Sequence, residues 1–436
     1  MKMKTLSLVL ISVLAYFSTS PTLQAVNPPP DGGYPGGNTA EGQNALLSLT
    51  TGTYNTALGW FSLQSNLTGN LNTAVGAGTL FFNTADANTA TGAGALLNNT
   101  SGANNTASGV FALFDNTTGG SNTATGLGAL GDNTTGSNNT AIGYQALLSN
   151  TTANSNTATG FQALLNNTTG GFNTANGFTA LLSNTIGFGN VATGFGTLQN
   201  STTGGANTAI GGTALQNNTT GGANTAIGNG ALSNNTTGDT NTALGISAGS
   251  GITTATDVIC IGSSGANVNN SCFIGNIHGV TTAINDAIPV LIDSAGQLGT
   301  MNSSRRYKTD IKPMDKSSEA ILALKPVSFR YKAHTDSAPQ FGLIAEQVAE
   351  VNPDLVVRDE NGEIYTVRYD AVNAMLLNEF LKEHKAFVEQ QRKVQEQGTI
   401  IAHQQKQIEA LTAGLHKVSA EIQMSKTGTQ TVLNNQ

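Results

Sequence analysis

One pattern of apolar and polar positions, NTAxGxxALxxNTTGxx, repeats through residues 38–245. Its leading Asn recurs every 17 residues, with a single step of 16 between Asn72 and Asn88. In all thirteen copies Ala lies two places after this Asn and Gly four places after it, and Leu fills the ninth place in the first twelve. Self-similarity at one short period predicts a solenoid.

The chemistry of the repeat favours β-structure. Seventeen residues are too few for two helices and a turn, and the Gly, Asn and Thr content disfavours helix. Two short strands and two turns fit, with NTTG as turn chemistry and the constant Gly at a tight turn or close backbone approach. We predict a mainly β, parallel solenoid with stacked Ala and Leu columns inside, so that Leu147 is buried and Gln145 faces solvent. Asn and Thr columns would form hydrogen-bonded ladders.

The predicted core of this solenoid is thin. Each buried Leu contributes roughly 2 kcal/mol, and the Ala column adds little bulk. Lateral association of several chains would thicken the core, so we expect the solenoid to be part of an oligomer.

Residues 246–302 lose the period and predict a β-rich connector. Short apolar strings remain at 258–261, 272–277 and 288–292, separated by polar turn residues. Cys260 and Cys272 lie in two of these strings, and the sequence leaves open whether they form a disulfide or are separate strand residues.

The C-terminal segment has apolar residues at every seventh position. They are Phe380, Phe387, Val394, Ile401, Ile408, Leu415 and Ile422. A second row is largely Gln in its middle. A seven-residue repeat of this length predicts a coiled coil over 376–424, and the aromatic and β-branched residues in its apolar row favour three strands. Three histidines of this segment are interpreted as solvated helix positions rather than metal ligands.

The N-terminus is typical of a secretory signal. Lys2 and Lys4 precede an apolar run at 6–17, and LQA at 23–25 is a small-residue cleavage site. We therefore predict a signal peptide at 1–25 and a linker at 26–37. The run is too short to span a bilayer, and we expect no transmembrane segment in the mature chain. The predicted location is outside the cell or at its surface.

Charge is distributed unevenly along the chain. No Lys or Arg occurs between Lys4 and Arg305, and only nine acidic residues lie between 26 and 300. The other 17 Lys and Arg and 17 Asp and Glu lie after residue 302 and cancel. A front part without cations is not a nucleic-acid-binding surface. This front part also lacks recurring carboxylates or histidines, which argues against a hydrolase site in the repeats. We predict no cofactor and no metal.

The NTAxG units resemble the head repeats of trimeric autotransporter adhesins. That resemblance implies a trimeric parallel β-roll for the head, residues 38–245. Those adhesins end in a membrane β-barrel anchor, which this sequence does not show. The many N-x-[ST] triplets follow from the repeat and are interpreted as structural rather than as glycan acceptors.

A second resemblance begins at Ser303. The strings SSRRYKTDIKPM, ILALKPVSFRYK, FGLIAEQVAEVNPDLV and YTVRYDAVNAMLLNEFLKEHK occur in this order between 303 and 392. They resemble the intramolecular chaperone domain of phage endosialidases and tail fibres. The resemblance implies a small α+β domain, ending in a trimeric coiled coil, that assists folding of an upstream β-fibre and then cuts itself off.

The resemblance also implies the residues of the cut. A Ser–Lys dyad of that family falls on Ser303 and Lys308, with the scissile bond between Asn302 and Ser303. Many members have Asp after the serine, whereas this chain has Ser304, a rival nucleophile. A lysine amine acts as a base only when neutral, which burial and like charges such as Arg305 favour. Five residues apart on an ideal helix or strand, the two side chains do not meet, so a turn or a neighbouring chain is required.

Two functions remain open from the sequence. The first is a homotrimeric fibre or adhesin-like protein, secreted or at the surface of a bacterium. It would release its chaperone domain by acting once on itself as a serine peptidase. The alternative is a trimer that never cuts, in which the C-terminal domain is a permanent clamp. The partner in both is the chain itself, and the head would bind a surface or glycan ligand that the sequence does not identify. An ice- or surface-binding Thr face is a third, weaker interpretation.

Overall fold

The computed structural model describes residues 34–432 except 285–286, 294–295, 333–337 and 360, and it describes no side chains beyond 425. The predicted signal peptide at 1–25 and most of the linker at 26–37 lie outside the described residues. The chain divides into two compact units, Met1–Thr281 and Thr282–Gln436.

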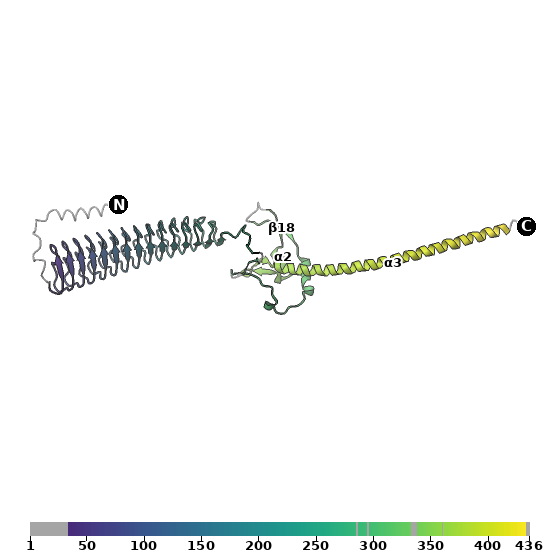
Figure 1. Ribbon diagram of the computed structural model, residues 1–436, viewed down its shortest axis with the longest axis horizontal. Coiled ribbons are helices and arrows are strands. Elements are labelled where there is room, and N and C mark those ends of the chain that lie inside the picture. Colours follow the sequence, from purple (N-terminus) through teal and green to yellow (C-terminus); the bar gives the residue numbers. More distant parts are fainter. Residues whose placement is uncertain (1–33, 285–286, 294–295, 333–337, 360, 433–436) are drawn as a thin grey trace. The chain divides into compact units, whose positions relative to one another are not determined.

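The first unit is a parallel β-solenoid, as predicted (Figure 1). Fifteen strands form one sheet in chain order, and every neighbouring pair is parallel. The strands are β1 Thr39–Glu41, β2 Thr56–Leu58, β3 Thr73–Val75, β4 Thr89–Thr91, β5 Thr106–Ser108, β6 Thr123–Thr125, β7 Thr140–Ile142, β8 Thr157–Thr159, β9 Thr174–Asn176, β10 Val191–Thr193, β11 Thr208–Ile210, β12 Thr225–Ile227, β13 Thr242–Leu244, β14 Val258–Ile261 and β15 Ser271–Ile274.

The register of this sheet follows the repeat. In β7 and β8, Ala141 pairs with Ala158, and the equivalent Ala residues pair in each successive copy up to β13. The short step of 16 residues is absorbed without a change of register, since Ala74 still pairs with Ala90. Identical residues therefore stack directly above one another along the solenoid.

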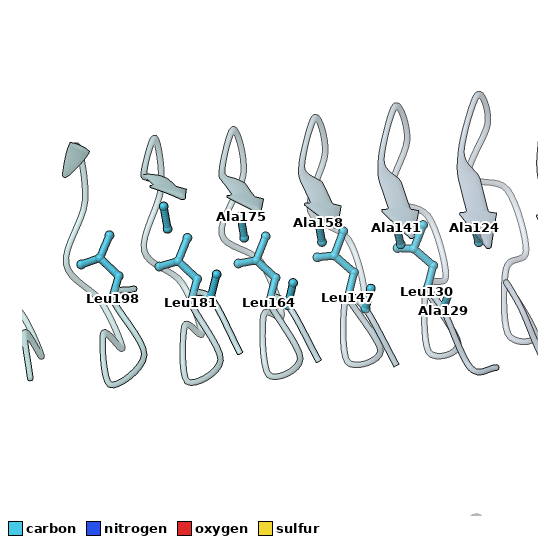
Figure 2. Close-up of a cluster of buried hydrophobic side chains, with 14 of the residues drawn as sticks. Ala124, Ala129, Leu130, Ala141, Leu147, Ala158, Leu164, Ala175, Leu181 and Leu198 are labelled. Atoms are coloured by element: carbon cyan, nitrogen blue, oxygen red, sulfur yellow. The ribbon is translucent and has the colours of Figure 1, made fainter. Parts of the chain in front are cut away.

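The Ala and Leu columns form the solenoid core, as Figure 2 shows for Ala124 to Leu198. Leu147 is fully buried, in agreement with the prediction. Gln145, expected at the surface, is instead half-buried and accepts a hydrogen bond from Gln162 of the next turn. Gln145 is therefore a poor solvent-facing control for Leu147.

Each of the thirteen repeats contains one three-residue strand, not the two strands expected from the length of the repeat. The Leu side of the turn is not extended, because Leu147 has a φ of 53° and the equivalent leucines have similar values. A left-handed residue with a Cβ costs roughly 1–2 kcal/mol. Burial of the Leu side chain, worth roughly 2 kcal/mol, offsets that cost in each turn.

The constant Gly at the fifth place is required by close backbone approach. Gly143 has a φ of +136°, and a Cβ placed on it would lie 2.3 Å from the carbonyl oxygen of Gly160 in the next turn. No side chain fits at that distance, and the equivalent glycines of the first twelve copies approach the next turn similarly closely. At the thirteenth, Gly245, the φ of +120° remains the reason for Gly.

Two columns of buried Asn form ladders between turns. At the first place of the repeat, the Asn139 side chain accepts from the backbone N–H of Asn156 at 3.0 Å. At the twelfth place, Asn150 donates from Nδ2 to Oδ1 of Asn133 at 2.8 Å. Because buried amides are costly unless bonded, these ladders stabilise the stack. The N-x-[ST] triplets that begin at the twelfth place have their Asn buried in the ladder.

The sheet continues beyond the last copy of the repeat, which ends at 245. Strands β14 and β15 extend it within the predicted connector, 246–302. Their register pairs Cys260 with Phe273 and Ile259 with Cys272, so the two cysteines point to opposite faces. Both are free thiols, with Cys260 buried and Cys272 exposed.

The described residues of the second unit form three small antiparallel sheets and a long helix, α3 in Figure 1. In chain order its elements are β16 Leu291–Ile292, β17 Leu298–Gly299, the 3-10 helices η1 Arg305–Tyr307 and η2 Asp315–Ala323, β18 Val327–Phe329, β19 Gln340–Gly342, α2 Ala345–Val351, η3 Pro353–Leu355, β20 Val356–Arg358, β21 Ile364–Val367 and α3 Tyr369–Val432. A small core of Val348, Leu355, Val367 and Met375 joins α2 and the β20–β21 pair to the start of α3.

Candidate functional site

The structure brings Ser303 and Lys308 together within one chain. Nζ of Lys308 donates a hydrogen bond to Oγ of Ser303 at 3.0 Å. The intervening residues form η1, in which the N–H of Tyr307 bonds the carbonyl of Ser304 and the N–H of Lys308 bonds that of Arg305. This single 3-10 turn reverses the chain and aligns the two side chains. A turn, rather than a neighbouring chain, thus provides the contact that the spacing left open.

The surroundings of the pair are polar and open. Residues 301–310 are all exposed in the single chain, including Asn302 on the N-terminal side of Ser303. Arg306 lies over the ring of Tyr307, with its guanidinium carbon 4.7 Å from the ring centre, which holds one of the two neighbouring cations beside the turn. Ser304 is the N-cap residue of η1 without a side-chain capping bond. The arrangement offers a hydroxyl, an amine and an adjacent peptide carbonyl, the parts of a nucleophile–base pair.

A buried serine in η2 was missed by the sequence reasoning. Ser318 is fully buried, and its hydroxyl donates to the Glu379 carboxylate of α3. The same oxygen accepts from Nδ2 of Asn378 at 2.7 Å and lies 3.4 Å from Nζ of Lys382. Lys382 also pairs with Glu379 at 2.7 Å. This Ser318 cluster fastens the segment that follows Lys308 to the long helix.

Two pKa shifts define how the Ser318 cluster responds to pH. The hydrogen bonds from Lys382 and then Ser318 lower the pKa of the Glu379 carboxyl, and the bond to Glu379 raises the pKa of Lys382. The lowered carboxyl pKa stabilises the folded state above the unfolded value of about 4.3, and this contribution disappears as pH falls through the folded value. The raised pKa of Lys382 stabilises the folded state at pH values below its unfolded pKa of about 10.4. This contribution is lost as pH rises through the pKa of Lys382 in the folded state.

Glu379→Gln should therefore destabilise the second unit at neutral pH and much less in acid, where the wild-type carboxyl is also neutral. The unfolding midpoints of wild type and variant, followed from about pH 7 to about pH 2, should converge below about pH 4. Glu409→Gln, at an exposed acid of the same helix outside both rows of the seven-residue repeat, provides the control and should show no such convergence. A wild-type–variant gap that stayed constant into acid would refute the role of Glu379.

One side of α3 carries an unpartnered apolar row within the described residues of the chain. The seven residues predicted from the seven-residue repeat are all exposed, from Phe380 to Ile422. The helix itself is continuous through the predicted coiled-coil segment, 376–424. A single helix of this length with an exposed apolar seam is suited to association with further helices.

The described residues offer neither a metal site nor a membrane-spanning helix. Among the described residues, no three His, Cys, Asp or Glu side chains gather as metal ligands, and no helix has the length and apolar character needed to cross a bilayer. His384 stacks on Phe380 of the same helix, with ring centres 6.4 Å apart.

Residues 303–357 match the family model described as the chaperone of endosialidase. This match confirms the resemblance drawn from the sequence, and it begins at Ser303 and includes Lys308. Neither the curated proteins nor the solved structures give a match to the chain. The chain therefore carries a chaperone-of-endosialidase region at 303–357, on the C-terminal side of a β-solenoid of 17-residue repeats.

Proposed function

We propose that this protein is a secreted, homotrimeric fibre whose C-terminal domain drives assembly and is then released by cleavage between Asn302 and Ser303. The observation that carries the proposal is the 3.0 Å hydrogen bond between Lys308 and Ser303, located at the start of the family match. The solenoid supplies the fibre, and the exposed seam of α3 supplies the association surface.

The chemistry uses the serine as an internal nucleophile. Oγ of Ser303 attacks the carbonyl carbon of Asn302, and the hydroxyl proton passes to the neutral amine of Lys308. The C–N bond between Asn302 and Ser303 then breaks, and the departing nitrogen takes the proton from Lys308. Water hydrolyses the resulting ester, leaving a carboxylate on Asn302 and restoring the Ser303 hydroxyl.

Assembly is needed for a reason other than bringing the pair together. The sequence left open whether a turn or a neighbouring chain creates the Ser303–Lys308 contact, and η1 creates it within one chain. Both side chains are nevertheless exposed, and an amine accepts a proton only when neutral, a form that burial favours. We infer that neighbouring chains cover the turn and so switch the pair on after assembly.

Disrupting the seam of α3 should therefore reduce both assembly and cleavage. Ile401→Asn with Ile408→Asn removes two exposed apolar residues of the row, far in sequence from the scissile bond. Light scattering should show loss of the trimer, and gel analysis should show more uncut chain. The matched control, Thr399→Asn with Lys406→Asn, changes helix positions away from the row and should do neither. Full cleavage by a monomeric seam variant would contradict the coupling.

The alternative function is a permanent trimeric clamp without cleavage. The exposed position of Lys308 in a single chain is the observation that favours it. Gel mobility of the purified wild-type trimer separates the two functions, since a clamp stays at full length. Export by a signal peptide at 1–25, and binding of a surface or glycan by the head, remain parts of the proposal. Secretion is tested by fractionating expressing cells.

A further inference from the structure

The solenoid carries one exposed apolar row that its fold does not use. In nine consecutive repeats, from the copy beginning at Asn105 to that beginning at Asn241, an apolar side chain occupies the fourth or sixth place, on either side of the constant Gly. The exposed members are Val110, Leu127, Ile142, Tyr144, Phe161, Phe178, Phe195, Ile210, Ile227, Leu244 and Ile246, here called the apolar stripe.

The aromatic part of the stripe is ordered. Tyr144, Phe161, Phe178 and Phe195 stack in sequence with ring centres 5.0–5.5 Å apart and interplanar angles of 8–18°. Where the sixth place becomes Gly212 and Asn229, the fourth place becomes Ile210 and Ile227, so those turns still expose an apolar side chain beside the constant Gly. Other exposed apolar residues of these repeats, such as Phe172, Ile186 and Phe188, fall at three different places and form no row.

The size and charge of the stripe suit a protein surface. At about 4.8 Å per turn, nine turns extend for about 40 Å. An apolar row of this length differs from the single, scattered apolar residues that are normal on a protein surface. The head contains no Lys or Arg, and its few acidic residues lie outside the fourth and sixth places of these nine repeats. Two such surfaces would meet without like-charge repulsion.

The stacking favours a second protein chain over a sugar. Each inner ring has both faces turned towards its neighbours in the stack, so ring edges are what remain for an external partner. Sugars bind preferentially against open aromatic faces, whereas ring edges pack well on aliphatic and aromatic side chains. Parallel copies of this chain present the same side chain at the same height, because all share one period.

We propose that the apolar stripe is the surface along which the heads of neighbouring copies pack in parallel register. This inference rests on the proposed homotrimer and adds the residues by which the heads join. Identical subunits around one axis bury the same patch on each copy. The stripe thereby supplies the extra core that a thin Ala and Leu interior lacks.

The test is cross-linking of single-cysteine variants in the full chain, uncut through Ser303→Ala and with the exposed thiol removed by Cys272→Ser. Phe178→Cys, with Phe178 49% exposed, tests the stripe, and Leu127→Cys repeats the test three turns away. Ile186→Cys is the control, because Ile186 lies in the same repeat as Phe178 and is 55% exposed but off the stripe. The probe is a short bis-maleimide, and light scattering is recorded on each sample.

The expected result is a cross-linked dimer band for both stripe variants and none for the control. Because the reagent joins two thiols, the third chain of each trimer stays in the monomer band. A trimer by light scattering whose stripe cysteines fail to cross-link, or cross-link no better than Ile186→Cys, would overturn the stripe while leaving the proposed function intact. A monomer by light scattering would overturn both.

Discussion

Leu147→Asp should destabilise the solenoid by about 4 kcal/mol or more, because it replaces a buried side chain with an unpaired carboxylate. Leu147 is fully buried between its equivalents in the adjacent turns, Leu130 and Leu164. No cationic side chain of the head can pair with the new carboxylate, since residues 5–304 contain no Lys or Arg. Denaturation of the uncut chain, followed by circular dichroism, measures the loss.

The control for this variant is Thr152→Asp. Thr152 is exposed and belongs to the same repeat as Leu147, so the same charge there should change stability by about 0.5 kcal/mol or less. Leu147→Ala should fall between the two, at about 2–4 kcal/mol, because it leaves a cavity without a charge. Equal midpoints for Leu147→Asp and Thr152→Asp would show that the Leu column does not form the core.

Ser303→Ala and Lys308→Ala should each abolish release of the C-terminal fragment while leaving trimeric, full-length chains. The first removes the nucleophile and the second removes the amine that bonds it at 3.0 Å. Intact mass of the purified protein checks both.

Two further substitutions separate catalysis from structure at this turn. Lys308→Arg preserves a cation and hydrogen-bond donors, but a guanidinium does not deprotonate in proteins, so it should remain uncut. Ser304→Ala removes the rival hydroxyl and should still be cut. Cleavage by Lys308→Arg would show that residue 308 acts as a donor rather than a base, and an uncut Ser304→Ala would transfer the nucleophile to Ser304.

The solenoid shows how far a repeat can be interpreted from sequence. The buried Ala and Leu columns and the parallel register follow directly from the spacing. The number of strands in each repeat does not follow from the spacing. An inward Leu recurs with the same period whether its backbone is extended or, like that of Leu147, left-handed. Strands β14 and β15 were separated from the head because they lack the motif, yet parallel pairing depends on backbone bonds and on inward residues such as Val258.

The site was predictable only through its resemblance to a family. Ser303 and Lys308 at a spacing of five are uninformative by themselves, since the 3-10 turn that joins them has no strong local signal in SRRYK. Ser318 was not predictable, because it lies in a polar stretch and its partners Asn378, Glu379 and Lys382 are about sixty residues away in sequence. Its role depends on packing that only the folded unit creates.

The central claim is cleavage between Asn302 and Ser303 by the pair that η1 aligns. N-terminal sequencing of the small fragment from purified wild-type protein, combined with its intact mass, tests that claim most directly. The account predicts a fragment that begins at Ser303 and contains the 134 residues 303–436. A folded wild-type trimer that stays at full length, or a fragment that begins at any other residue, would contradict it.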